Sequence, residues 1–169
     1  MKISKKNYSQ IVRNFTFGVE DSLVSTVGLL AGIAIAGMDK SSIILTGLVL
    51  IFVEGFSMAV GSLLSEQSVE EYEIKKEVAL SKSMLASIVM FFSYVLAGLI
   101  PLAPYFYSSS KTSVVISVAL TLLSLFLLGV FNAKMFHVRA LRDGLFTLLM
   151  GGIAIMVGIA VGQIVGVVG

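Results

Sequence analysis

The alternation of apolar and polar residues divides the chain into five long apolar segments joined by polar connectors. Each segment has about 20 residues or more, the length that a helix needs to cross the hydrocarbon core of a bilayer. The segments run approximately over residues 17–37, 42–65, 84–106, 112–133 and 145–168. The pattern therefore predicts an all-α integral membrane protein, in which residues 1–169 form a single transmembrane domain of five helices embedded in a lipid bilayer.

Two polar stretches lie outside these segments. Residues 1–16 mix apolar side chains with basic ones, namely Lys2, Lys5, Lys6 and Arg13. Such a mixture is typical of a short helix that lies on the membrane surface. Residues 66–83 form the longest connector and are strongly acidic at their start. We therefore expect an N-terminal interfacial helix over residues 1–16 and an acidic cytoplasmic connector over residues 66–83.

The distribution of charge predicts how the chain is oriented. Only 13% of the residues are charged, and the mean hydropathy is +1.00. Of the 12 Lys and Arg residues, all but Lys40 and Lys111 fall at the N-terminus or in connectors on the same side. Positively charged loops remain in the cytoplasm. We therefore expect a cytoplasmic N-terminus and, with an odd number of spans, a C-terminus outside.

The residue types present exclude several classes of function. The chain has no cysteine, which excludes disulfides and thiolate metal sites, and its single histidine, His137, excludes a histidine-rich metal cage. The basic residues form no patch with interleaved aromatic residues, so we expect no nucleic-acid partner. No nucleophile–base pair or phosphate-binding loop is recognisable, and we do not expect an enzyme.

The candidate chemistry begins with Glu54, which lies at the centre of the apolar stretch 43–64. A charged side chain at bilayer depth costs roughly 2.5–3.5 kcal/mol on insertion scales, so such residues usually face a partner, a cavity or a cation. Met58 lies four residues later on the same helix face. Asp21 lies about as far from the inner end of the first segment as Met58 lies from the inner end of the second, and Glu54 lies about one turn deeper. We predict that Asp21, Glu54 and Met58 bind a cation in the membrane.

Each of these three residues also has a structural interpretation. Asp21 could cap the first helix, Met58 could fill the core or face lipid, and Glu54 could be protonated or paired within the protein. If the site binds a metal, the thioether of Met58 indicates which metals it would prefer. It adds nothing for magnesium or calcium, and it favours softer transition metals.

A second acidic group follows the second segment. Its members recur at helical spacing, so that one stripe of a helix would carry Glu66, Glu70, Glu73 and Glu77. Like charges at these spacings repel one another unless a cation or a basic partner compensates them. We predict a surface that collects divalent cations; the alternative is a solvated charged face.

Small residues recur on two of the predicted helices. Gly28 and Gly32 make a GxxxG step in the first segment, and a two-step ladder in the last segment comprises Gly158, Gly162 and Gly166. In lipid this spacing lets two helix backbones approach closely. The ladders predict either packing within the chain or a seam between two copies.

Three motifs carry a family resemblance. Residues 17–32 read FGVEDSLVSTVGLLAG, residues 56–65 read FSMAVGSLLS and residues 98–105 read GLIPLAPY. Together with five spans and a cytoplasmic N-terminus, these motifs resemble the vacuolar iron transporter family over nearly the whole chain. The resemblance implies a homodimer with a pore between its subunits. It also implies proton-coupled export of ferrous iron, and often manganese, from the cytosol, with no permanently bound cofactor.

The resemblance also assigns roles to residues. Asp21 matches an aspartate implicated in metal translocation, Met58 matches a metal ligand in the pore, and Glu54 falls where the family places pore-lining polar residues. The sequence departs from the family pattern in two places. Ser22 replaces a glycine, and the long glutamate-rich insertion between the second and third helices is reduced to residues 66–77.

The sequence therefore predicts an exporter of divalent transition-metal ions, Fe²⁺ and also Mn²⁺, that exchanges them for protons. Its location would be the cell membrane in a prokaryote and a vacuolar-type membrane in a eukaryote. Two alternatives use the same residues differently. A channel-like or non-metal cation carrier would use the acids to bind protons or organic cations, and a non-transporting scaffold would use the glycine ladders and acidic stripe to bind partners.

Overall fold

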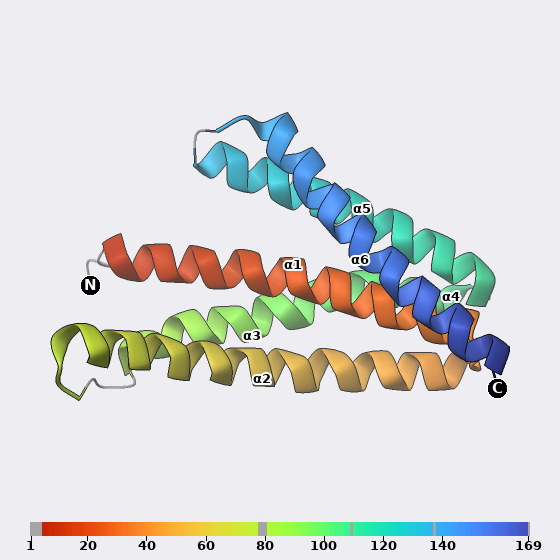
Figure 1. Cartoon of the computed structure of the whole chain (residues 1–169), viewed down its shortest axis with the longest axis horizontal. Helices are drawn as coiled ribbons and strands as arrows, with labels where there is room; N and C mark the ends of the chain where they lie inside the picture. Colours follow the sequence, from red (N-terminus) through yellow and green to blue (C-terminus); the bar gives the residue numbers. More distant parts are fainter. Residues whose placement is uncertain (1–4, 78–80, 109, 137, 169) are drawn as a thin grey trace.

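The chain is helical throughout the part that the structure, a computed structural model, describes. Residues 5–77, 81–108, 110–136 and 138–168 are described. Residues 1–4 of the predicted interfacial helix, residues 78–80 of the acidic connector and His137 lie outside these ranges. The helices, shown in Figure 1, are α1 (Lys5–Ile35), α2 (Lys40–Ile74), α3 (Ser81–Leu102), α4 (Pro104–Tyr107), α5 (Ser110–Met135) and α6 (Ala140–Val168).

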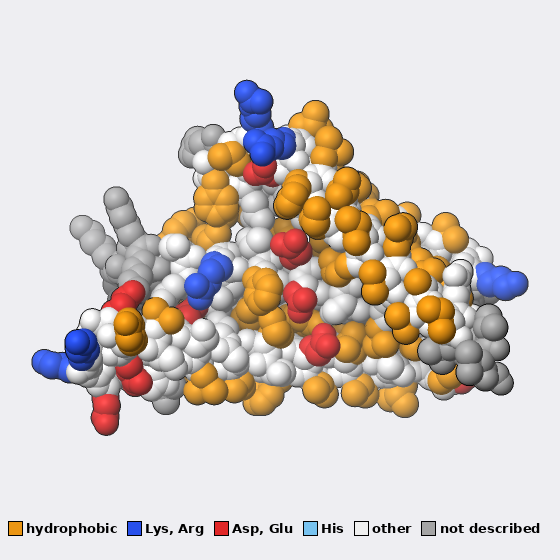
Figure 2. Space-filling view, viewed as in Figure 1, with side chains coloured by type: hydrophobic (Ala, Val, Ile, Leu, Met, Phe, Trp, Pro, Cys, Tyr) orange, Lys and Arg blue, Asp and Glu red, His pale blue; other side chains and the backbone are white. Residues whose placement is uncertain are grey.

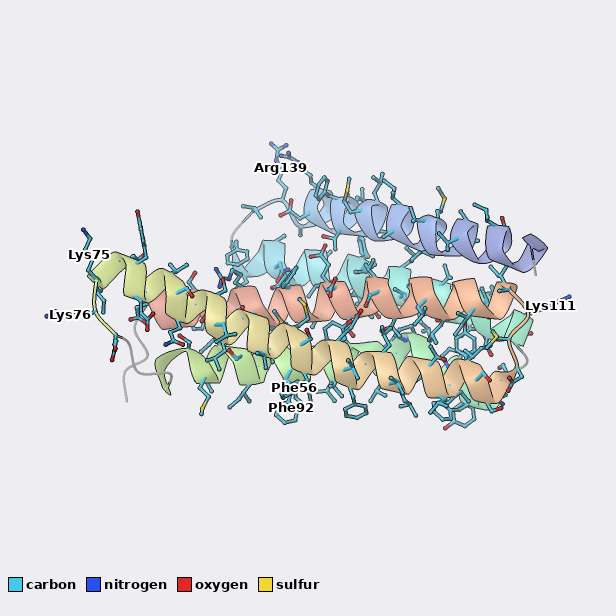
Figure 3. All side chains as sticks on the ribbon, turned by 60° about the horizontal axis from the view of Figure 1, so that its bottom comes forward. Phe56, Lys75, Lys76, Phe92, Lys111 and Arg139 are labelled. Atoms are coloured by element: carbon cyan, nitrogen blue, oxygen red, sulfur yellow. The ribbon has the colours of Figure 1, made fainter. Side chains whose placement is uncertain are left out.

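Five helices in the described ranges, α1, α2, α3, α5 and α6, are long and apolar enough to cross a membrane. This confirms the predicted fold class and the predicted number of spans. Large apolar side chains cover much of the outer surface (Figure 2). Phe56 of α2 and Phe92 of α3, for example, point away from the bundle side by side (Figure 3). Such a surface suits lipid, because lipid tails are as apolar as the side chains themselves.

The helices α1 and α3 form the interior of the bundle. In the most apolar 18-residue stretch of each long helix, about half of α1 and 56% of α3 are buried, against 17–28% for the other three. α1 packs against α3 most extensively and also contacts α2, α5 and α6. One core cluster joins Leu30 of α1 to Ile51 of α2 and Leu102 of α3. Residues on α1 are therefore placed to meet side chains from every other long helix.

The N-terminal segment differs from the prediction of a separate interfacial helix. From Lys5 onward it continues without a break into the first span. No proline or turn interrupts α1, so the change from polar to apolar sequence happens within one helix. Asn14 is buried and its amide donates hydrogen bonds to Ser62 and Glu66 of α2. The start of α1 is thus packed against α2 rather than separated from the bundle.

The glycine ladders of α1 and α6 face each other inside one chain. A Cβ atom added at Gly158 would lie 2.5 Å from the carbonyl oxygen of Gly28, and one added at Gly32 would lie 2.8 Å from the carbonyl oxygen of Gly158. A Cβ added at Gly162 would lie 2.6 Å from the Cα of Gly32. Side chains would force these backbones apart. The four glycines therefore serve packing within the chain, as the first of the two interpretations expects.

Two prolines lie near the end of α3, one inside the helix and one just after it. Proline has no backbone N–H group, so the helix loses hydrogen bonds there. Pro101 lies in the last turn of α3, and Pro104 begins α4. Hydroxyl groups on α5 donate to carbonyl groups there: Ser117 to Pro101 at 2.7 Å and Ser113 to Pro104 at 3.1 Å. Backbone acceptors inside a membrane need such internal partners.

The orientation across the membrane remains a prediction. α1 begins and α6 ends at opposite ends of the molecule (Figure 1). Lys75 and Lys76 project from the end at which α1 begins, and Lys111 projects from the other end (Figure 3). We refer to the first of these as the Lys75 end, which the charge pattern predicts to be cytoplasmic.

The glycine seam gives a direct test of the packing. Gly162→Ala should lower the free energy of unfolding by about 1–3 kcal/mol, because its methyl group would collide with the backbone of α1. Gly152→Ala, in the same helix, is the matched control, since its added Cβ would meet only Leu122 at 3.8 Å. Thermal unfolding of both purified variants measures the difference. Equal melting temperatures would show that the seam does not hold α1 against α6.

Candidate metal centre

Two acidic side chains lie on neighbouring helices inside the spanning part of the bundle, and Ser25, one turn after the first of them, contacts the second. Asp21 lies within α1 and Glu54 within α2, and the two are within electrostatic reach of each other. Asp21 lies far inside a helix that begins at Lys5, so it does not cap that helix. Both residues are half-buried. On the face of the molecule that Figure 2 shows, acidic side chains form a row across the middle, over α1 and α2; we call this the acidic face.

The Glu54 carboxylate is held by two hydroxyl groups. Its Oε2 accepts a short hydrogen bond from the Tyr94 hydroxyl and a second one, at 3.2 Å, from Ser25 Oγ. The two hydroxyl oxygens lie 2.8 Å apart. Both bonds reach the same carboxylate oxygen, and each orients the group. Glu54 is thus hydrogen-bonded within the protein, as its structural interpretation expects, and it is also half-exposed toward the acidic face.

Ser22 fixes the position of Tyr94. Its hydroxyl donates to the Tyr94 carbonyl at 2.6 Å, from α1 to α3. The close approach depends on Gly98 of α3, where an added Cβ would lie 2.7 Å from Ser22 Oγ. Ser22 therefore has a structural role. It joins α1 to α3 one residue after Asp21, and it holds the helix turn that carries Tyr94.

Met58 lies one turn from Glu54 and lines a separate cavity. This inner cavity, of about 630 Å³, lies between α1, α2 and α3 and is also bordered by Met90, Phe17 and Ser62. Phe17 also borders a cavity of about 260 Å³ against α6, which contains Asp21 and Glu20. The structure therefore places Asp21 within electrostatic reach of Glu54 and Met58 in a different cavity from Asp21, with Phe17 bordering both cavities.

Glu20 adds a carboxylate that the sequence reasoning did not select. It lies beside Asp21 on α1, half-buried, in the cavity that Met150 and Gly151 of α6 also border. The signal was present in the sequence, since two adjacent acids open the first span. It was missed because consecutive residues on a helix point in directions about 100° apart.

The acidic stripe is divided by the structure. Glu66 turns inward and is buried, where its Oε1 accepts hydrogen bonds from Arg13 at 2.8 Å and from Asn14 at 3.1 Å. This differs from an exposed stripe, because α1 extends far enough toward the Lys75 end to cover that face of α2. Glu70 is half-buried and Glu73 is exposed, both on α2.

Glu77 lies beyond the helix and so leaves the predicted stripe. α2 ends at Ile74, and Lys75 adopts the left-handed conformation that closes it. Within the described residues, no group of three acidic or histidine side chains converges to hold a metal ion. The single chain therefore offers carboxylates in pairs, Asp21 with Glu54 and Glu20 with Asp21, rather than a closed cage.

Sequence reasoning also missed the partners of the acids. Tyr94 and Ser25 hold Glu54, while Arg13 and Asn14 hold Glu66. Asn14 and Arg13 stood in a segment interpreted as interfacial, and Tyr94 stood among apolar residues of the third span. Only the docking of α1 against α2 and α3 identifies them as partners.

The sequence is similar to one known protein family over most of its length. A sequence model of the VIT family matches residues 12–80 and 67–163. Vacuolar iron transporter homolog 4 of Arabidopsis thaliana is 26% identical over 169 aligned residues, which cover 94% of this chain and 85% of the relative. Vacuolar iron transporter homolog 2 of the same plant is 27% identical, with 95% and 87% covered.

A third relative is an uncharacterized protein of Methanocaldococcus jannaschii, which is 26% identical over 158 residues, with 83% of this chain and 82% of the relative covered. The family match spans most of the chain, including the acids in α1 and α2 and the five apolar helices. The chain therefore belongs to the VIT family and is an integral membrane protein.

Proposed function

We propose that this protein transports divalent transition-metal ions, Fe²⁺ and also Mn²⁺, out of the cytosol in exchange for protons. The observation that carries the proposal is that Asp21 and Glu54 lie within electrostatic reach of each other in the spanning helices, with Ser25 of α1 hydrogen-bonded to Glu54 of α2. Two carboxylates at bilayer depth repel each other and lose hydration, and a divalent cation offsets both effects. Two relatives that bear the name of vacuolar iron transporter homologs support the metal class.

The thioethers narrow the choice of metal. Met58 borders the inner cavity together with Met90, and Met150 borders the cavity that contains Asp21. Thioether sulfur favours softer transition metals over magnesium and calcium. We propose that Met58 is the sulfur ligand on the α2 side, one turn from Glu54.

The acidic face also supports a homodimer. Asp21 and Glu54 are half-exposed on the side of the bundle, where lipid would be an unfavourable neighbour for a carboxylate. A second copy related by twofold symmetry would cover the same face of both chains. Each acid would then occur twice around one pore, which supplies the ligands that one chain holds only in pairs.

In the proposed cycle, Glu66, Glu70, Glu73 and Glu77 attract cations at the Lys75 end. The metal then moves to Asp21, Glu54 and Met58 of both subunits. Protonation of Asp21 or Glu54 removes the negative charge that holds the ion and releases it outside. Tyr94 and Ser25 orient Glu54 for the incoming ion, because their hydroxyl groups donate hydrogen bonds to its carboxylate.

Removing the charge of either acid should strongly weaken transport. Asp21→Asn and Glu54→Gln keep the side-chain shape and remove the charge, so kcat/KM for Mn²⁺ uptake into proteoliposomes should fall by about tenfold or more. The measurement is repeated with and without an imposed pH gradient. Asp143→Asn, at the start of α6, is the matched control and should leave uptake unchanged.

Uptake that persists in the Asp21→Asn, Glu54→Gln double variant would contradict the proposal. Proton flux without any metal flux in the wild-type protein would favour the non-metal cation carrier instead.

Removing the Tyr94 hydroxyl should weaken transport without abolishing it. Tyr94→Phe keeps the buried ring and deletes one hydrogen bond to a charged group, which is worth about 1.5–3 kcal/mol. We expect kcat for Mn²⁺ uptake to fall about tenfold, because Glu54 loses its orientation. Tyr105→Phe serves as the control, since Tyr105 is equally buried in a cluster with Leu30 and Leu102. Equal rates for the two variants would remove Tyr94 from the mechanism.

A further inference from the structure

Arg13 stands between two cavities at the Lys75 end of the molecule. The outer cavity, of about 60 Å³, is bordered by Glu66, Glu70 and Gln10. The inner cavity, of about 630 Å³, reaches Met58 and Ser57. Arg13 and Ser65 border both. The Arg13 guanidinium therefore lies beside the direct route along α2 from its acidic end to Met58.

The carboxylate beside Arg13 is only half satisfied. Glu66 has a side chain that is 2% exposed, and its Oε1 accepts hydrogen bonds from Arg13 and Asn14. Its Oε2 is buried and makes no hydrogen bond within the described chain. A buried carboxylate oxygen without a donor or cation is costly. Glu66 therefore has room for a stronger partner than the one it holds.

The two members of the ion pair differ sharply in exposure. The Arg13 side chain is 66% exposed, against 2% for Glu66. Arg13 can swing into water at little cost, because an exposed charge is well solvated. Glu66 cannot lose its partner in the same way, since an unpaired buried charge is strongly unfavourable. Arg13 therefore leaves only when another cation takes its place.

We propose that Arg13 is a cation gate: its guanidinium occupies a cation position on Glu66, and a divalent metal ion displaces it on the way to the Met58 cavity. This inference rests on the proposed transport function and adds a specificity-determining residue to it. Ser62 lies close to the position, since the Asn14 amide nitrogen donates hydrogen bonds to both Glu66 Oε1 and Ser62 Oγ. A metal on Glu66 would engage Oε2 together with Oε1, which the guanidinium does not do.

The exchange discriminates by charge. A monovalent ion that replaces Arg13 substitutes one positive charge for another and loses the hydrogen bond that the guanidinium donates to Oε1. A divalent ion brings twice the charge to a buried carboxylate, where electrostatic interactions are stronger than in water. The gate should therefore admit divalent metals and resist the large excess of monovalent ions in the cytosol.

Removing each partner separately should shift the KM for Mn²⁺ in opposite directions. In the full-length protein in proteoliposomes, Arg13→Gln removes the competitor, so KM should fall by about fivefold and uptake should become sensitive to excess K⁺. Glu66→Gln removes the binding group, so KM should rise. Arg139→Gln deletes an exposed positive charge from the loop before α6 (Figure 3) and should leave KM unchanged.

Restoring the charge after folding provides a second measurement. The chain has no cysteine, so Arg13→Cys can be modified at that position alone. A positively charged alkylthiosulfonate should return the KM and the K⁺ resistance of Arg13→Cys to wild-type values. A neutral reagent of similar size should not.

Three results separate the outcomes. Wild-type protein that moves no metal would overturn the transport proposal and the gate with it. Wild-type uptake in which Arg13→Gln and Glu66→Gln shift KM in the same direction would overturn the gate alone, because a merely structural clamp would respond equally to the loss of either member. Restoration of KM by the neutral reagent would also overturn it.

Discussion

The architecture depends on one constraint: a carboxylate within an apolar bundle must have a compensating partner. Within the chain, one acidic group meets this constraint and another does not. Glu66 accepts hydrogen bonds from a cation of the same chain, Arg13, and from the Asn14 amide. Among the described residues, Glu54 accepts hydrogen bonds from the hydroxyl groups of Tyr94 and Ser25, and Asp21 adds repulsion between like charges. The first acid is neutralised within the chain, and the second pair is left with negative charge. That difference distinguishes a gate from a binding site.

The packing of α1 against its neighbours sets the geometry of both. Gly18 lets α1 approach α3 closely, since an added Cβ would lie 3.0 Å from the Met90 carbonyl oxygen. Ser22 and Gly98 repeat the close approach one turn later, beside Asp21 and Tyr94. On another face, the glycine seam fixes α1 against α6. Because lipid offers no hydrophobic gain, such backbone proximity supplies much of the energy of helix association. It also leaves α1 little freedom, so motion during transport is more easily accommodated by side chains such as Arg13.

The sequence predicted the elements well, because a long apolar run leaves few alternatives to a spanning helix. It also predicted the glycine seam as one of two possibilities. It could not predict which helix each face meets. Glu66 lies in an acidic stripe by spacing alone, and only the extension of α1 over α2 explains its burial. Tyr94 looks like an ordinary apolar residue until the docking of α3 carries it to Glu54. The predicted interfacial helix was wrong for a related reason, since polarity changes along α1 without any residue that would break the helix.

The central claim is that Asp21 and Glu54 together define a cation position inside the membrane. Anomalous diffraction from crystals of the full-length protein soaked in Mn²⁺ tests it most directly. The account predicts an anomalous peak between the two carboxylates, on the side of Met58. Peaks confined to the acidic end of α2, with none beside Asp21 and Glu54, would contradict it.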